Sequence, residues 1–123
     1  PLREFSAAEL RRELAANHAP TRRLGYREAR EYMFGEIDDE NGRVRLFYTG
    51  DTFEANGEIP DGNVVNTEHI WPQSKFGGAS GAKSDLHHLQ PTWNRANGSR
   101  GSLAFAEIED TTVDEWWAGP SKT

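Results

Sequence analysis

The amino-acid sequence predicts an α+β fold, and three observations support that class. Helical patterns fill the first third of the chain, short segments bounded by turn residues follow, and another helical pattern comes after them. At 123 residues the chain is long enough to bury one modest hydrophobic core and too short to divide comfortably into two domains. We therefore expect a single domain spanning residues 1–123.

The first predicted helix begins at Ser6. Ser6 and Glu9 have the spacing of a capping box, in which each side chain bonds the backbone N–H of the other residue. Phe5 and Leu10 flank this pair at the spacing of a hydrophobic staple. These signals predict a helix over residues 6–17.

A second helix is predicted after Pro20. One stripe of this segment repeats at helical spacing, with acidic and basic residues interleaved around it. The residues of the stripe are Tyr26, Ala29, Arg30, Met33 and Ile37. Both N-terminal helices are expected to be structural scaffold.

Two short strands are predicted in the middle of the chain. Asn41-Gly42 is a strong turn signal, and the alternation of the residues after it predicts a strand over 44–49. The next stretch, 51–62, contains two glycines and a proline and is predicted to be a loop. A second strand is expected over 64–70.

A third strand and a further helix are predicted after a glycine-rich loop at 77–81. The strand is expected over 86–89. Because proline suits the first turn of a helix and glycine suits its end, a helix is predicted from Pro91 to about Gly98. Residues 103–108 are expected to form another strand.

Composition excludes several classes of protein. No apolar run approaches the roughly 20 residues of a membrane span, and the amino terminus shows no basic segment followed by an apolar one, as a signal peptide would. We therefore expect no membrane association. The chain has no cysteine, so a disulfide framework and a thiolate zinc site are both excluded.

The distribution of charge leaves a nucleic-acid partner open. The net charge of −6 argues against such a partner, because phosphates are bound mainly by lysine and arginine. Residues 66–101, however, contain four basic residues and two acidic ones. A locally basic segment in an acidic protein can still attract a polyanion, with strong dependence on salt.

Three motifs in that segment carry the residue types needed to hydrolyse a phosphodiester. They span residues 66–74 (Asn-Thr-Glu-His-Ile-Trp-Pro-Gln-Ser), 84–89 (Ser-Asp-Leu-His-His-Leu) and 97–101 (Asn-Gly-Ser-Arg-Gly). The reaction needs a base, a cation and a donor that holds the phosphate. Neutral histidine suits the first role near pH 7, so a histidine base predicts rates that fall below about pH 6 to 6.5. A carboxylate with an amide oxygen suits Mg²⁺.

Glu68 and His69 can serve one phosphate only under a geometric condition. Adjacent residues of an ideal strand point to opposite faces. We therefore expect the strand to bend or end near His69.

The residues leave two other functions open. One is a non-catalytic nucleic-acid-binding module, which would bind without cutting. The other is a zinc site built from His69, His87, His88 and an acid.

The three motifs resemble the endonuclease I family of the ββα-metal (His-Me finger) nucleases. The resemblance rests on residues 66–74, 85–91 and 97–101, and weaker similarity extends it to about two thirds of the chain. It implies a ββα-metal core at about residues 64–102, with additional N-terminal helices. Family members cut DNA and often RNA with little sequence preference and leave 5′-phosphate ends.

The resemblance also implies a role for each matching residue. His69 matches the general base, while Glu68 and Asn97 match the ligands of one Mg²⁺, whose site Mn²⁺ or Ca²⁺ can also occupy. Arg100 matches an arginine that contacts phosphate or supports the site. One departure is that Ser102 stands where the family has asparagine.

Six further residues are candidates for supporting the site or contacting phosphate. They are Asp85, His87, His88, Lys75, Lys83 and Asn94. Of the two adjacent histidines, one is expected to face inward and the other outward. We expect a monomer that acts on nucleic acid, DNA first and RNA second. The family implies a secreted or periplasmic location, although this sequence shows no signal peptide.

Overall fold

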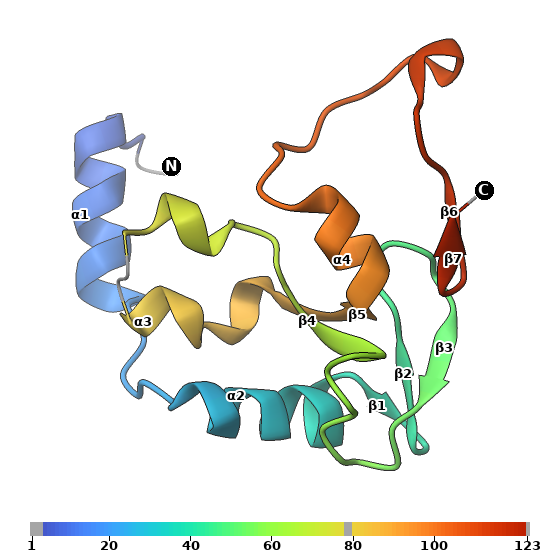
Figure 1. The fold of residues 1–123 in the computed structure, drawn as a ribbon. Coiled ribbons are helices and arrows are strands. Elements are labelled where there is room, and N and C mark those ends of the chain that lie inside the picture. Colours follow the sequence, from blue (N-terminus) through green and yellow to red (C-terminus); the bar gives the residue numbers. More distant parts are fainter. Residues whose placement is uncertain (1–3, 78–79, 123) are drawn as a thin grey trace.

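The computed structural model describes residues 4–77 and 80–122, and it confirms the α+β class (Figure 1). The helices are α1 (Ala7–Asn17), α2 (Tyr26–Tyr32), α3 (Ser80–Lys83) and α4 (Asn94–Arg100). The strands are β1 (Asp39–Glu40), β2 (Arg43–Arg45), β3 (Thr52–Glu54), β4 (Val65–His69), β5 (Leu89–Trp93), β6 (Trp117–Ala118) and β7 (Ser121–Lys122). They form three small antiparallel sheets, β1-β2-β3, β4-β5 and β6-β7.

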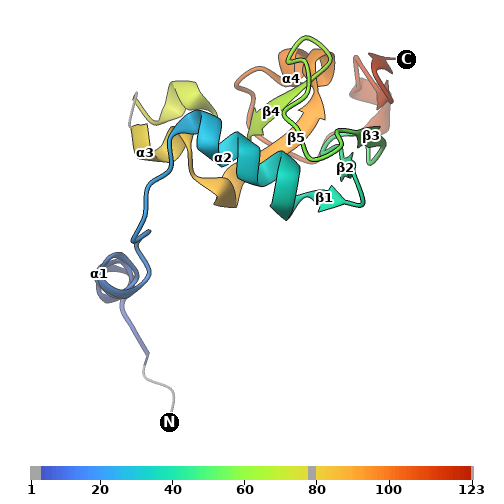
Figure 2. The ribbon, with the colours of Figure 1, turned by 90° about the horizontal axis from the view of Figure 1, so that it is seen from below.

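Helix α1 is stabilised at its start by local side-chain contacts. The predicted capping box is present, with the Glu9 amide donating to Ser6 Oγ at 3.3 Å and the Ser6 amide donating to Glu9 Oε2 at 2.9 Å. None of the helix residues is buried, and Figure 2 shows α1 standing apart from the rest of the molecule. This helix therefore does not shape the site.

Helix α2 follows the predicted stripe for two turns and then widens into a π-helix, Met33–Ile37. The Asp38 amide donates to the Met33 carbonyl five residues earlier, at 2.9 Å. This wider turn rotates the stripe, so Phe34 is fully buried while Ile37, expected on the buried face, is 58% exposed. The core on this helix also includes Ala29.

The first predicted strand is shorter than expected. Strand β2 ends at Arg45, and a tight turn follows in which the Gly50 amide donates to the Leu46 carbonyl at 2.8 Å. The chain then returns as β3, Thr52–Glu54, in the stretch that was predicted to be a loop. Pairing with β2 supplies backbone partners that composition does not reveal.

The second predicted strand is confirmed as β4, but its partner is displaced. Residues Leu86–His88 form a 3₁₀ turn, and β5 begins where the predicted strand ended. Pro91 therefore lies inside β5, opposite Thr67, and not at the start of a helix.

Hydrogen-bond alternation explains how a strand accepts Pro91. The Asn94 amide donates to the Val64 carbonyl at 2.9 Å, and the Ile70 amide donates to the His88 carbonyl at 3.0 Å. These bonds fix the bonded pairs of the ladder, and Pro91 falls at a non-bonded pair, where no N–H is needed toward β4. Its carbonyl accepts the Phe47 amide at 2.8 Å, which ties β5 to the turn after β2.

The structure differs from the predicted loop at 77–81 and from the predicted strand at 103–108. The predicted glycine-rich loop overlaps α3, and two of its residues, 78–79, lie outside the described residues. Residues 103–108 form no strand; Figure 1 shows the chain after α4 running outward before it returns at β6. No helix in the described part of the chain combines the length and apolarity needed to cross a bilayer.

Candidate active site

Strand β4 and helix α4 bring the first and third sequence motifs, 66–74 and 97–101, to one hollow of about 360 Å³. The hollow is lined by Glu68, His69, Gln73, Asn94, Asn97 and Arg100, among others. Because α4 follows directly after β5 and packs against β4, residues about 30 apart in sequence become neighbours. Three of the residues implied by the resemblance, the acid, the base and the amide, therefore share one cavity.

Glu68 is a buried carboxylate with a fixed cationic partner. Glu68 is 1% exposed, and one of its carboxylate oxygens accepts a hydrogen bond from Arg100 Nη1 at 2.7 Å. Burial raises the pKa of Glu68, although Tyr48, Arg100 and His88 oppose that rise. A second positive charge beside this group would favour its ionised form.

Arg100 braces the end of β4. In addition to Glu68, its guanidinium donates to the carbonyls of His69, at 3.2 Å, and Ile70, at 3.0 Å, and it lies over the Phe105 ring. These contacts hold the carboxylate and the strand end together. Of the two roles that the resemblance implies for Arg100, they correspond to support of the site.

Hydrogen bonds and burial favour the neutral form of His69. Its Nε2 lies 3.0 Å from the Lys83 carbonyl, which can only accept, so Nε2 carries the proton. Its Nδ1 is then an acceptor, and Gln73 Nε2 donates to it at 3.3 Å. Burial lowers the pKa of His69, whose residue is 6% exposed, and this favours the neutral form.

The end of strand β4 allows the adjacent residues Glu68 and His69 to reach one site. Strand β4 ends at His69, as expected, and the chain turns through Pro72 into the 3₁₀ turn Gln73–Lys75. The hollow wraps around this end, so Glu68 on one face and His69 on the other both line it.

Aromatic side chains fix the plane of the His69 ring. Tyr26 stacks on it with ring centroids 5.7 Å apart, and His88 meets it edge-on at 5.6 Å. Phe76 completes this set at 6.2 Å. A base held in one orientation loses little entropy when it meets its proton donor.

Sequence reasoning missed three residues of the site. Gln73 lies inside the first motif, so its position there was an available signal. Tyr26 and Tyr48 come from distant parts of the chain, and nothing in their spacing indicated contact with the site.

The buried hydroxyl of Tyr48 lies beside Glu68. It makes no hydrogen bond of ordinary geometry among the described residues, but burial, followed by the charge of Glu68, raises its pKa. Tyr48 therefore stays protonated next to the carboxylate.

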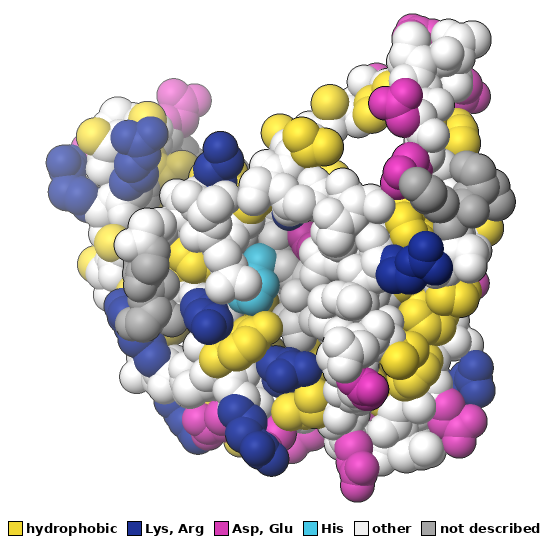
Figure 3. Space-filling view, in the orientation of Figure 1, with side chains coloured by type: hydrophobic (Ala, Val, Ile, Leu, Met, Phe, Trp, Pro, Cys, Tyr) yellow, Lys and Arg dark blue, Asp and Glu magenta, His cyan; other side chains and the backbone are white. Residues whose placement is uncertain are grey.

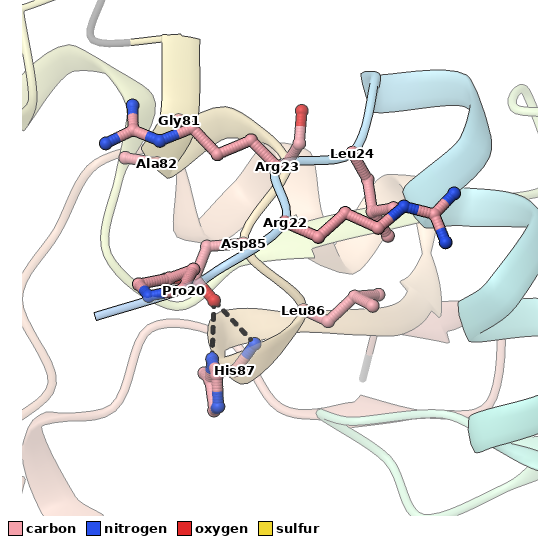
Figure 4. Close-up of a pocket in the computed structure, with 10 residues that line it drawn as sticks. Pro20, Arg22, Arg23, Leu24, Gly81, Ala82, Asp85, Leu86 and His87 are labelled. Carbon is pink, nitrogen blue, oxygen red and sulfur yellow. Dashed lines mark hydrogen bonds and ion pairs between the residues drawn. The ribbon is translucent and has the colours of Figure 1, made fainter. Parts of the chain in front are cut away.

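The two adjacent histidines separate as expected. His88 faces His69 and its Nε2 donates to the Ala82 carbonyl at 2.6 Å, while the His87 side chain is 89% exposed. His87 Nδ1 pairs with Asp85 at 2.7 Å, and both line a second hollow of about 550 Å³ (Figure 4). Burial alone would raise the pKa of Asp85, but the bonds from His87 outweigh it and the pKa is lowered.

The remaining candidates are Asn94, Lys75 and Lys83, and of these only Asn94 is among the lining residues of the first hollow. Asn94 lines it and its Oδ1 accepts from Asn66 Nδ2 at 2.7 Å. Lys75 lies on the turn at the strand end, and Lys83 Nζ lies 4.8 Å from the centroid of the Tyr26 ring. In Figure 3 a histidine appears at the centre of this face, with lysine and arginine side chains below it and to its left.

The oxygen atoms that line the first hollow fit a hard divalent cation. Asn97 uses its Nδ2 to donate to Asn66 Oδ1 at 2.9 Å and to the Thr67 carbonyl at 3.3 Å, and no described residue donates to its Oδ1. That oxygen and the Glu68 carboxylate form an oxygen-only pair, the preference of Mg²⁺.

The residues considered for zinc are not assembled. Within residues 4–77 and 80–122, no three His, Cys, Asp or Glu side chains group as metal ligands. His87 lies in the second hollow, and the Nε2 atoms of His69 and His88 are engaged with carbonyls.

Comparison with known proteins gives a family match over most of the chain. The model of the family described as endonuclease I matches residues 8–121. Two similar curated proteins are both named extracellular ribonuclease, one from Bacillus subtilis (strain 168), 38% identical over 66 residues, and one from Bacillus amyloliquefaciens, 37% identical over 67 residues. Each alignment covers 50% of this chain and 22% of the relative. No solved structure matches.

Proposed function

Because this chain belongs to the endonuclease I family, we propose that it is a metal-dependent endonuclease that hydrolyses phosphodiester bonds of DNA and RNA with little sequence preference. The observation that carries the proposal is the shared hollow of Glu68, His69 and Asn97. The relatives named extracellular ribonuclease support RNA as a substrate and a location outside the cell. We propose a monomer.

The proposed catalytic unit is a ββα-metal core inside a single domain. It consists of β4, β5 and α4, within about residues 64–102. The antiparallel pairing of β4 with β5 and the packing of α4 on β4 support this assignment.

Glu68 and the Asn97 amide oxygen are the proposed ligands of one Mg²⁺, a site that Mn²⁺ or Ca²⁺ can also occupy. When bound, the ion offsets negative charge on the phosphate as the reaction proceeds. Arg100 fixes the carboxylate through its bond at 2.7 Å and favours the charged form of Glu68, against the effect of burial.

His69 Nδ1 is the proposed general base. Its Nε2–H is held by the Lys83 carbonyl, so Nδ1 is the nitrogen that can take a proton from water. The resulting hydroxide forms a bond to phosphorus, and the bond from phosphorus to the 3′ oxygen breaks. The 3′ oxygen takes a proton from solvent, so the products are a 5′-phosphate and a 3′-hydroxyl.

Gln73 occupies the position next to the base nitrogen. Its amide lies 3.3 Å from His69 Nδ1, where the attacking water has to stand. Gln73 therefore has to move aside, or to offer its oxygen to that water, when substrate binds.

The test combines substrate, metal and variant. Supercoiled plasmid and structured RNA are incubated with the protein in Mg²⁺ or in chelator, beside His69→Ala and the matched control His87→Ala. We expect cleavage by the wild type and the control in Mg²⁺ only, with 5′-phosphate ends, and about a thousandfold less by His69→Ala. Cleavage that survives both chelator and His69→Ala would refute the mechanism.

A further inference from the structure

We propose that Arg30 and Lys83, gathered on the ring of Tyr26, form a clamp for a substrate phosphate that flanks the scissile one. The proposal rests on the proposed function, because it assigns part of the nucleic-acid backbone to a second subsite beside His69. It assigns Arg30 and Tyr26 to substrate binding, a role that their positions in sequence do not reveal.

The clamp is built around one aromatic ring. Arg30 Cζ lies 5.6 Å and Lys83 Nζ lies 4.8 Å from the centroid of the Tyr26 ring. The same ring stacks on His69, with centroids 5.7 Å apart. Both cations and the proposed base therefore contact the same side chain.

Neither cation has an anionic partner among residues 4–77 and 80–122. No carboxylate of the described residues lies within ion-pair distance of Arg30 or Lys83. By contrast, Arg22 and Arg27 on the same stretch of chain pair with Glu28 and Glu31. Two unpaired like charges on one ring repel each other, and an anion placed between them would relieve that repulsion.

Arg30 is oriented by the strand that carries the acid. Its Nε donates to Thr67 Oγ1 at 3.2 Å, and Thr67 immediately precedes Glu68. The two terminal nitrogens have no hydrogen-bond acceptor among residues 4–77 and 80–122. A guanidinium anchored through Nε still presents a planar fork, which matches two oxygens of a phosphate.

Lys83 supplies the adaptable half of the clamp. Its backbone carbonyl holds His69 Nε2, while its side chain is exposed and extends over Tyr26. The same residue thus fixes the base through its backbone and faces substrate through its ammonium group. A substitution of this side chain leaves the carbonyl that orients His69 in place.

The test measures binding where cleavage is blocked. Short fluorescein-labelled RNA and DNA oligonucleotides are titrated in chelator at several salt concentrations, with anisotropy as the readout. The double variant Arg30→Gln/Lys83→Gln is compared with Arg43→Gln/Arg45→Gln, which removes two exposed arginines from β2 and gives the same change in net charge.

We expect the clamp double variant to bind about ten- to a hundredfold more weakly, with a salt slope smaller by roughly one to two. The control should lose about threefold or less, since its charges act only at long range. Lys83→Gln alone should already lower the slope, and it tests the clamp even if loss of the bond from Arg30 to Thr67 disturbs folding.

Equal effects of the two double variants would overturn the clamp, as would a wild type that does not bind either oligonucleotide in chelator. Cleavage assays keep this outcome separate from the proposed function. If wild-type protein binds as expected but never cuts in Mg²⁺, the nuclease proposal fails while the binding subsite stands. If it cuts and the clamp variants change neither KM nor the salt slope, only the clamp fails.

Discussion

The two hollows described above have no lining residue in common, and their polar groups differ in burial. In the smaller one, of about 360 Å³, the polar groups are buried and fixed by partners, as in the pair of Glu68 with Arg100. The larger one, of about 550 Å³, has apolar side chains such as Leu24 in its wall and arginines at its rim (Figure 4). Its acid and histidine, Asp85 and His87, pair in contact with water.

This difference teaches that volume is a poor guide to chemistry in this fold. Both hollows contain a carboxylate and a histidine, but in the smaller one burial sets the direction in which the pKa of each group is shifted. Burial lowers the pKa of His69 and raises that of Glu68, whereas the bonds from His87 lower the pKa of Asp85. Matched substitutions in the two hollows test this difference.

The largest effect is expected from exchanging each carboxylate for its amide. Glu68→Gln should lower the cleavage rate in Mg²⁺ by about a thousandfold, close to 4 kcal/mol of transition-state stabilisation, because it removes the charged metal ligand. Asp85→Asn should change the rate by less than about twofold. Initial rates on plasmid and RNA measure both, and similar losses would contradict the contrast.

The second effect concerns folding stability. Arg100→Leu leaves Glu68 buried without its cation, in a pair whose side chains are 10% and 1% exposed, and should lower the free energy of unfolding by about 3–5 kcal/mol. His87→Leu removes the solvent-exposed partner of Asp85 and should cost less than about 1 kcal/mol. Urea denaturation near pH 7 gives both values.

A double variant sharpens this result. In Arg100→Leu/Glu68→Gln the buried charge is absent, so most of the lost stability should return. If Arg100→Leu alone cost as little as His87→Leu, the buried pair would not be a structural feature of the site.

The third effect is on the pH dependence of cleavage. Because burial lowers the pKa of His69, the base stays neutral below the ordinary histidine range, and the acid loss of rate should begin below that range. The raised pKa of Glu68 adds a second loss on the acid side, since a protonated carboxylate does not bind metal. Extra Mg²⁺ should reverse the loss of rate that is due to protonation of Glu68, but not the loss that is due to protonation of His69.

Rate profiles at two Mg²⁺ concentrations separate these contributions. A profile that starts to fall above pH 6.5 would contradict a buried, neutral His69. A profile that is flat at every acid pH would contradict a histidine base altogether.

The smallest effect is expected at Tyr48. Tyr48→Phe removes the protonated hydroxyl beside Glu68 and should weaken Mg²⁺ affinity about tenfold, with little change in rate at saturating metal. Tyr32→Phe is a matched control, because Tyr32 lies on α2 and does not line the first hollow. Equal Mg²⁺ dependence in the two variants would show that Tyr48 does not act on the site.

The core of the site was predictable from sequence because its elements are close in the chain. Glu68, His69 and Asn97 lie within 30 residues, and a strand, its antiparallel partner and a helix have few ways to connect over that length. The end of β4 at His69 also followed from local rules, since neighbouring strand residues face opposite ways.

The predictions that were wrong concern elements whose structure depends on tertiary partners. Pro91 was assigned to a helix because its place in a non-bonded pair of β5 exists only when β4 lies alongside. Strand β3 was hidden for the same reason, and Ile37 turned outward through a π-turn that periodicity does not encode. Tyr26 reaches the site from 43 positions before His69, so only folding reveals it.

The proposal that Glu68 and Asn97 hold the ion while His69 acts as the base is tested most directly by measuring metal binding separately from cleavage. Isothermal titration of Mn²⁺ or Mg²⁺ into wild type, His69→Ala, Glu68→Gln and Asn97→Ala separates holding the ion from using it. One ion per chain should bind to wild type and to His69→Ala, which no longer cuts, while Glu68→Gln and Asn97→Ala bind at least about tenfold more weakly. Unchanged affinity of Glu68→Gln for the metal ion would contradict the assignment of Glu68 as a metal ligand.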